Sequence, residues 1–372
     1  MEMRWQPGGR RVAAVFAASA ALAALASGCG HSKHAALPPP STVPPSTTTS
    51  STTTTTPRHA HHKPVCPLTG APPPAGKVPQ RPALAVKVEN LPAARPQWGL
   101  DKADIVFEEP VEGGITRFVA VYQCQDASRI EPVRSGRFVD VQILQPLGKV
   151  LFAYSGAIQP VIDAIDSPGS LLEDVGADRA GGAYLRDTTR LEPHNLETST
   201  AALYSAGATF GFPLTDPPLP YFDYGRAAPG GSPASAVHLW FSNLDETTWT
   251  WGIRSRRWFR SYSDTGPAIQ GDDVQISAAN VVVLRVNEYP TPYIEDETGA
   301  HENELTLTGN GQAYVFRDGF VLKGTWQRPS LSQPATLVMP DGAKMNLTPG
   351  NTWEELLPTT ASDRAAALGI AG

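Results

Sequence analysis

A low-complexity stretch near the amino terminus limits where this chain can fold. Residues 30–64 are rich first in Pro, then in Ser and Thr, and finally in His, and residues 46–56 are wholly Ser and Thr. Such a composition offers too few apolar side chains to build a core, so we expect a disordered, solvated stalk over residues 29–65. The remainder of the 372-residue chain is long enough for two ordinary domains.

The segment before the stalk has the pattern of an export signal. Three arginines precede an apolar run, residues 12–26, which is too short for a comfortable bilayer span. The run ends in small residues followed by Cys29, which resembles the lipobox of bacterial lipoproteins, although Leu25 lies one place earlier than the leucine of the usual pattern. We predict a lipoprotein signal peptide over residues 1–28 and lipidation of Cys29, with palmitate-type acyl chains anchoring the protein in the membrane. An ordinary signal peptide is the alternative.

Charge and motif content exclude several classes of partner. The net charge is −6 and the basic residues are scattered, so nucleic acid is not an expected partner. Glycine-rich phosphate loops of the Walker or Rossmann type are absent from the sequence, and we expect no cofactor. The histidines of the stalk, His59, His61 and His62, have no fixed scaffold to hold a coordination geometry, so we expect no metal site.

The chain after the stalk changes texture near residue 212. Over residues 66–212, apolar runs at 83–88, 105–107 and 118–122 predict strands, and residues 160–165 and 198–206 predict helices. This mixture predicts an α/β domain. Thr198 or Ser199 is the expected cap of the second helix.

Residues 236–358 predict a β-rich domain, since β-branched and aromatic side chains dominate its apolar runs. We expect turns at residues 309–311, 317–319 and 340–342. Trp249 and Trp251 would share one face of a strand, where they either form a platform for stacking sugar rings or fill the core. The two regions together predict the fold class α+β.

At the polar segment 87–137 the sequence resembles a known family, the YerB-like bacterial lipoproteins, whose two halves are domains of unknown function (DUF3048, N- and C-terminal). The matching stretches cover nearly everything after the stalk, and in the first half they are Pro67-Leu68-Thr69-Gly70, Ala94-Arg95-Pro96-Gln97, Gly99-Leu100, Ala103-Asp104-Ile105-Val106, Val111-Glu112-Gly113-Gly114-Ile115-Thr116-Arg117-Phe118, Pro132-Val133-Arg134-Ser135 and Arg137. Those of the second half are Phe316-Arg317-Asp318-Gly319, Gly324-Thr325-Trp326 and Leu347-Thr348-Pro349-Gly350-Asn351-Thr352-Trp353. The resemblance implies an exported lipoprotein with an α/β first domain and a β-rich second one, and it brings no established activity.

Cys66 and Cys124 depart from the family pattern. Both lie beside matched motifs, and an exported chain would meet an oxidising compartment, so we predict a disulfide between them. Two separate buried thiols are the alternative.

Several polar residues of the segment 87–137 are candidates for ligand binding. Three arginines in particular, if they converge, would bind a carboxylate or phosphate through forked hydrogen bonds. Structural ion pairs with the neighbouring acids are the other interpretation. The candidate residues are Asn90, Arg95, Asp104, Glu108, Glu112, Arg117, Arg134 and Arg137.

Two functions remain open from the sequence. The first is a non-catalytic, membrane-anchored module on the outer face of the cell that binds a cell-wall polymer or an envelope protein. The second is an enzyme acting on an anionic envelope substrate through an arginine-lined cleft, with chemistry like that of the LytR-CpsA-Psr phosphotransferases. The sequence shows no catalytic signature, which favours the first. His194 with Asn195 and Glu197 is a weaker candidate for a catalytic base.

Overall fold

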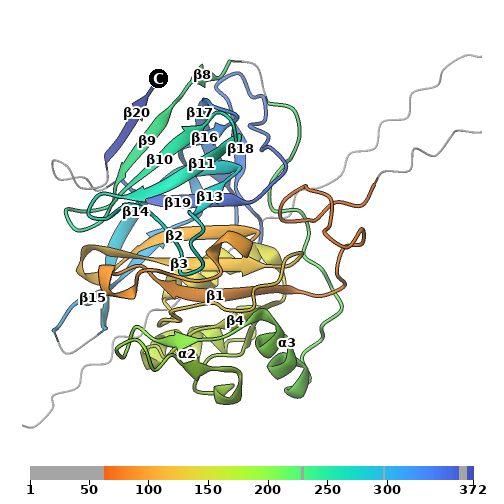
Figure 1. Ribbon diagram of the computed structural model, residues 1–372, viewed down its shortest axis with the longest axis vertical. Helices are drawn as coiled ribbons and strands as arrows, with labels where there is room; N and C mark the ends of the chain where they lie inside the picture. The colour runs from red at the N-terminus through yellow and green to blue at the C-terminus, as the bar shows by residue number, and fades with distance from the viewer. Residues whose placement is uncertain (1–62, 228–229, 296–297, 360–366) are drawn as a thin grey trace, which may run out of the picture. The chain divides into compact units, whose positions relative to one another are not determined.

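Two β-sheets packed face to face form the framework of this chain (Figure 1). The computed structural model describes residues 63–227, 230–295, 298–359 and 367–372. Cys29, the predicted signal peptide and nearly all of the predicted stalk lie outside these residues. Among the described residues, no helix is long and apolar enough to cross a membrane.

The large sheet has twelve strands, ten of which follow the order β18-β17-β16-β14-β19-β2-β3-β1-β4-β5, while β8 pairs with β17 and β15 pairs with β14. Their bounds are β1 Ala83–Glu89, β2 Ile105–Val111, β3 Ile115–Tyr122, β4 Val150–Ala153, β5 Leu172–Asp174, β8 Ser232–Pro233, β14 Asn280–Ile294, β15 His301–Thr306, β16 Gly309–Arg317, β17 Phe320–Arg328, β18 Thr336–Val338 and β19 Thr352–Pro358.

A six-stranded sheet follows the order β12-β11-β10-β9-β20, with β13 paired to β11. Its bounds are β9 Ala236–Trp240, β10 Glu246–Gly252, β11 Arg257–Tyr262, β12 Gly266–Pro267, β13 Ser277–Ala278 and β20 Ala367–Ala371, and a separate pair consists of β6 Leu185–Arg186 and β7 Leu196–Glu197. The α-helices are α1 Phe138–Leu144, α2 Gln159–Ile165 and α3 Thr200–Thr209, and the short 3-10 turns are η1 Pro92–Ala94, η2 Leu100–Lys102, η3 Glu112–Gly114, η4 Gln145–Leu147 and η5 Gly181–Ala183.

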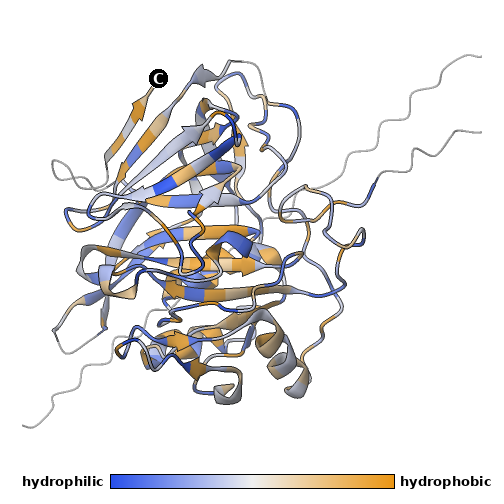
Figure 2. Ribbon diagram, in the orientation of Figure 1, coloured by the Kyte–Doolittle hydropathy of each residue, from blue (hydrophilic) through white to orange (hydrophobic). Residues whose placement is uncertain are grey.

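The core has two layers, one on each face of the large sheet. One layer joins this sheet to the six-stranded sheet and to α3, and the other joins it to α1, α2 and the segment 221–224. Figure 2 shows hydrophobic residues along the central strands of the large sheet. Because both faces are covered, β1, β2 and β19 are buried at every position.

The α+β class agrees with the sequence prediction, and β1, β2 and β3 contain the three predicted runs. The shorter strands β4 to β7 were not predicted. Ser199 is the cap of α3, and its hydroxyl accepts a hydrogen bond from the backbone N–H of Ala202 at 3.2 Å. The prediction of a turn at residues 309–311 was wrong, because these residues begin the strand β16. Gly311 serves close packing instead, since a Cβ there would lie 2.5 Å from the indole nitrogen of Trp326.

β19 was not predicted as a strand, yet it lies in the middle of the large sheet. It runs parallel to β14 on one side and to β2 on the other. Through β19, strands from the two regions that differ in sequence texture join one continuous sheet. The domain boundaries at 66–212 and 236–358 stay a prediction.

The predicted disulfide is present. Cys66 and Cys124 are both buried and are bonded across a sequence separation of 58 residues. In the chain-entropy model, a loop of this length contributes on the order of 4 kcal/mol by restricting the unfolded chain. The bond ties the segment before β1 to the segment that follows β3.

Glu354 on β19 generates a prediction about pH. Burial raises the pKa of Glu354 from 4.5 to about 8, against the attraction of Arg328. The folded chain therefore holds a proton that the unfolded chain releases, and this contribution to stability is lost as the pH rises from 4.5 towards 8. Glu354→Gln lacks the titrating carboxyl group. As the pH rises through that window, its free energy of unfolding should therefore gain on that of the wild type by about 1.4 kcal/mol for each pH unit.

Urea unfolding followed by tryptophan fluorescence between pH 5 and 8 measures this difference. Glu192→Gln is the matched control, because the Glu192 side chain is 67% exposed, and its difference from the wild type should not vary with pH. A constant difference for Glu354→Gln across the window would contradict the raised pKa.

Candidate functional site

Charged side chains gather where β1 and β4 end, on the face of the large sheet covered by α1. These two strands are parallel, and ligands often bind at the carboxyl ends of parallel strands. The register aligns Glu89, Arg117 and Glu109 across β1, β3 and β2, and opposite positions share a face. We call the whole group the ionic cluster, which consists of Lys87, Glu89, Glu109, Glu112, Arg117, Arg134, Arg137, Asp140, His194, Glu295 and Glu302.

Lys87 is the most deeply buried cation of the ionic cluster. Its ammonium group is fully buried, contacts the carboxylate of Glu109, and lies 2.7 Å from that of Asp140. Burial lowers the pKa of Lys87 to about 8, although Asp140 acts in the opposite direction. Asp140 also accepts a hydrogen bond from the backbone N–H of Arg137 at 2.6 Å. One carboxylate thus neutralises Lys87 and holds the first turn of α1.

Glu112 is shared by two arginines. The guanidinium of Arg137 binds both of its carboxylate oxygens, with Nε at 2.9 Å from Oε2, and Arg117 Nη2 lies 3.4 Å from Oε1. Burial alone would raise the pKa of Glu112, but the hydrogen bonds and charge of Arg137 lower it. The geometry is that of a forked arginine–carboxylate pair, so Glu112 already occupies the position that an anionic ligand would take at Arg137.

The hairpin of β14 and β15 closes the ionic cluster from the second half of the chain. Glu295 pairs with Arg137 at 2.9 Å, and Glu302 accepts the backbone N–H of Phe138 at 2.7 Å. Burial raises the pKa of Glu302 to about 7. The start of α1 is therefore held by acids from a segment that lies far away in the sequence.

The part of the ionic cluster nearest to solvent surrounds Glu89. Its carboxylate is buried and lies 3.2 Å from Nε of Arg134 and 2.9 Å from Nδ1 of His194. The side chains of Arg134 and His194 are 24% and 20% exposed, against 6% for Arg117 and 2% for Arg137. Arg134 and His194 are thus the members most accessible to a ligand, and we call this the open end of the cluster.

The three arginines therefore come together, which was the condition for the predicted anion site, but each lies beside a carboxylate. Carboxylates outnumber the lysine and arginine side chains in the ionic cluster. This arrangement matches the interpretation as structural ion pairs for Arg117 and Arg137. A binding role for the predicted residues stays a prediction, and the geometry restricts it to the open end.

Two other predicted residues lie on the opposite face of the sheet. Glu108 binds the buried Arg260 through both oxygens, at 2.6 and 2.9 Å, and the charge of Arg260 keeps the pKa of Glu108 below its usual value despite burial. Burial and the neighbouring Glu108 raise the pKa of Glu355. Asn90 donates to the hydroxyl of Thr116 at 2.8 Å. These contacts belong to the core between the two sheets.

Asp104 and Arg95 are the last two predicted binding residues, and both contact other parts of the protein in ways that hold the fold together. Asp104 accepts the backbone N–H groups of Gln123 and Cys124 at 2.7 and 2.9 Å, which fixes the turn that leads out of β3. The guanidinium of Arg95 lies 3.5 Å from the ring centroid of Tyr262 and pairs with Asp264. Neither residue belongs to the ionic cluster.

Sequence reasoning missed several members of the ionic cluster. Lys87 follows four apolar residues in a strand that is buried at every position. A charge in such a strand signals a partner, which the sequence alone does not name. Asp140, Glu295 and Glu302 reach the cluster only through the folding of α1 and of the β14–β15 hairpin. Within the described ranges, no three His, Cys, Asp or Glu side chains are arranged to hold a metal ion.

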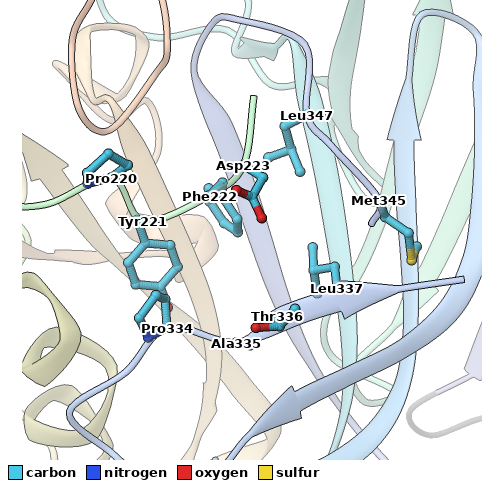
Figure 3. A pocket seen from close by; sticks show the side chains of 10 residues that line it. All are labelled: Pro220, Tyr221, Phe222, Asp223, Pro334, Ala335, Thr336, Leu337, Met345 and Leu347. Atoms are coloured by element: carbon cyan, nitrogen blue, oxygen red, sulfur yellow. The ribbon is translucent and has the colours of Figure 1, made fainter. Parts of the chain in front are cut away.

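A separate pocket of about 150 Å³ lies beside β18 (Figure 3). Most of the residues that line it have apolar or aromatic side chains, among them Tyr221, Phe222 and Leu337. Asp223, at its rim, pairs with Lys344 at 2.8 Å. The predicted ligand-binding residues do not line this pocket.

Lys87 offers a test of the ionic cluster. Lys87→Met would leave Glu109 and Asp140 buried without their cation, and we expect it to lower the free energy of unfolding by about 3 to 5 kcal/mol. Lys149→Met is the matched control, since its side chain is 54% exposed and lies 3.7 Å from Glu173, and it should cost less than about 1 kcal/mol. Chemical denaturation measures both, and equal effects would contradict the structural role of Lys87.

Comparison with known proteins agrees with the resemblance seen in the sequence. Residues 68–212 match the N-terminal domain, and residues 237–353 the C-terminal domain, of the family described as "Protein of unknown function (DUF3048)". The chain is 26% identical over 285 residues to "Putative lipoprotein YerB" of Bacillus subtilis (strain 168), a match that covers 76% of this chain and 83% of that protein.

The crystal structure of the YerB protein from Bacillus subtilis shares the fold. It superposes with a TM-score of 0.69 at 24% identity and covers 83% of this chain and 100% of the solved chain. Since the two family matches together span most of the residues after the predicted stalk, this chain belongs to the DUF3048 family of YerB-like proteins.

Proposed function

We propose that this chain is an exported lipoprotein, anchored through Cys29 on the outer face of the cell membrane, whose folded part binds a cell-envelope component without transforming it. The lipobox-like end of the apolar leader supports the anchor. The disulfide between Cys66 and Cys124 suits an oxidising compartment. A similar protein carries the name of a putative lipoprotein, which is consistent with this location.

The main support for binding without catalysis is that the arginines of the ionic cluster are already paired with carboxylates. An enzyme acting on a phosphorylated substrate needs cations that are free to meet charge developing in the transition state. Here Arg137 is already bound by Glu112 and Glu295, and Arg117 by Glu112 and the carbonyl of Ser135. These groups act as a rigid support, and they leave ligand recognition to surfaces that solvent reaches.

One observation favours the second candidate, an enzyme acting on an anionic envelope substrate. The buried carboxylate of Glu89 orients His194 through Nδ1, and Arg134 lies against the same carboxylate. An imidazole held in this way is a possible general base, and the partly exposed guanidinium beside it would hold an anion. The open end is therefore the part of the molecule where catalysis would take place.

Substitution of Cys29 tests the proposed membrane location. Cys29→Ala protein, produced in a bacterium that processes lipoproteins, should move from the membrane fraction to the medium or the soluble envelope fraction, because it has lost its lipid attachment site. The wild-type protein, and Cys66→Ala/Cys124→Ala as a control that lacks the other cysteines, should stay in the membrane fraction. Membrane retention of the Cys29→Ala protein would contradict the proposed anchor.

A second experiment distinguishes binding from catalysis, using variants of the open end. The purified lipidated chain in detergent is mixed with isolated cell walls and, separately, with polyprenyl pyrophosphate. We expect co-sedimentation with the cell walls and no release of phosphate or transfer product from the pyrophosphate. Turnover that is lost in both His194→Ala and Arg134→Ala, with unfolding midpoints unchanged, would overturn the non-catalytic role and establish the enzyme.

A further inference from the structure

The outer face of the six-stranded sheet carries aromatic side chains that lie outside the hydrophobic core. Trp249 and Trp258 point inward and are fully buried, so Trp249 fills the core, in line with one of the two roles considered for it. Trp240 and Phe259 lie on the opposite face and are partly exposed. The register places His238 opposite Thr248, and Phe259 opposite Thr250, on this outer face.

Both exposed rings lie against glycines of a neighbouring strand. A Cβ on Gly369 of β20 would come within 3.1 Å of two ring atoms of Trp240. A Cβ on Gly252 of β10 would come within 2.5 Å of the ring of Phe259. Because these glycines have no side chain, each ring can pack closely against the neighbouring strand, and each remains partly exposed to solvent. Trp240 also stacks on His238, with ring centroids 5.8 Å apart and planes inclined by 28°.

Hydroxyl groups occupy the positions between the two rings. Thr248 and Ser261 are opposite one another on β10 and β11, and Thr250 is opposite Phe259. Nδ1 of His238 lies 2.9 Å from the hydroxyl oxygen of Thr248. The surface therefore combines flat apolar rings with neutral groups that donate and accept hydrogen bonds.

The charge of this face is the third feature. Glu246 and Arg257 stand at opposite ends of it, opposite Trp240 and Gly252 respectively, and the positions between them on β9, β10 and β11 are uncharged. Among these strand positions Arg257 is the one cation, and it already donates to Ser277 and Asn351. Arg254 and Arg256 lie beyond it, in the turn that joins β10 to β11. An uncharged ligand fits this face better than a charged one.

We infer that the outer face of the six-stranded sheet binds an uncharged saccharide chain of the cell envelope, whose sugar rings stack on Trp240 and Phe259. The C–H face of a sugar ring is apolar and packs on an aromatic face, and its hydroxyl groups reach Thr248, Thr250 and Ser261. The inference rests on the proposed function, because it names the ligand class and the surface of the proposed envelope-binding module.

The test uses the full lipidated chain in detergent and three uncharged probes, which are soluble arabinogalactan, dextran and chitotetraose. Isothermal titration calorimetry should show saturable binding of at least one probe. Trp240→Ala and Phe259→Ala should each weaken this binding about 10-fold or more, and Trp240→Phe should retain most of it, because it keeps an aromatic face. Phe320→Ala is the matched control, since Phe320 is 46% exposed and lies in the other sheet, and it should leave the affinity unchanged.

The outcomes separate this inference from the proposed function. If isolated cell walls bind the chain but no uncharged probe does, or if a probe binds Trp240→Ala and Phe259→Ala as tightly as the wild type, the saccharide surface is refuted and the binding module stands. If neither cell walls nor probes bind, both proposals fail. Concentration-dependent self-association that is lost in Trp240→Ala would assign the face to a second copy of the chain and overturn the inference. Unchanged unfolding midpoints verify that the variants are folded.

Discussion

The insertion of β19 between β14 and β2 is the contact on which the rest of the fold depends. It pairs in parallel with both neighbours and makes one sheet from strands that are far apart in the sequence. Trp353 of β19 packs edge-on against Phe118 of the first half and Trp249 of the second. Without this strand, the two halves would share neither a hydrogen-bonded ladder nor this aromatic cluster, so we regard β19 as the element that makes the fold cooperative.

Charge is buried on both faces of that sheet, with the same physical logic. On one face Arg260 is surrounded by Glu108 and Glu355, and on the other Lys87 is surrounded by Glu109 and Asp140. A buried ion is tolerated only when a partner of opposite charge and further hydrogen bonds replace its water. Such networks specify which strands lie side by side. They also pair several of the charges that were candidates for ligand binding from the sequence alone, namely Glu108, Glu112, Arg117 and Arg137.

In the binding module that we propose, recognition would fall to surfaces that these networks leave free. At the open end, Arg134 and His194 share the carboxylate of Glu89 and reach solvent. On the six-stranded sheet, Trp240 and Phe259 pack against glycines of the neighbouring strands, with hydroxyl side chains between them. The first surface suits an anionic group and the second an uncharged sugar chain. A module held at the membrane surface would use such surfaces to contact polymers of the envelope.

The sequence by itself determined the family, the α+β class and the three long strands β1, β2 and β3 of the first region, because each depends on local composition, periodicity or an ordered set of motifs. It also predicted the disulfide, with two separate thiols as the alternative. It also singled out Arg117, Arg134 and Arg137 as candidates for one site, on the condition that they converge. Only the tertiary structure decided that Glu112, Glu295 and the other acids neutralise them, and that β19 is a central strand despite its two glutamates. The physical reason is that the favourable partners of a buried charge come from elements distant in the chain, and a one-dimensional pattern does not show which carboxylate will replace the water around a given cation.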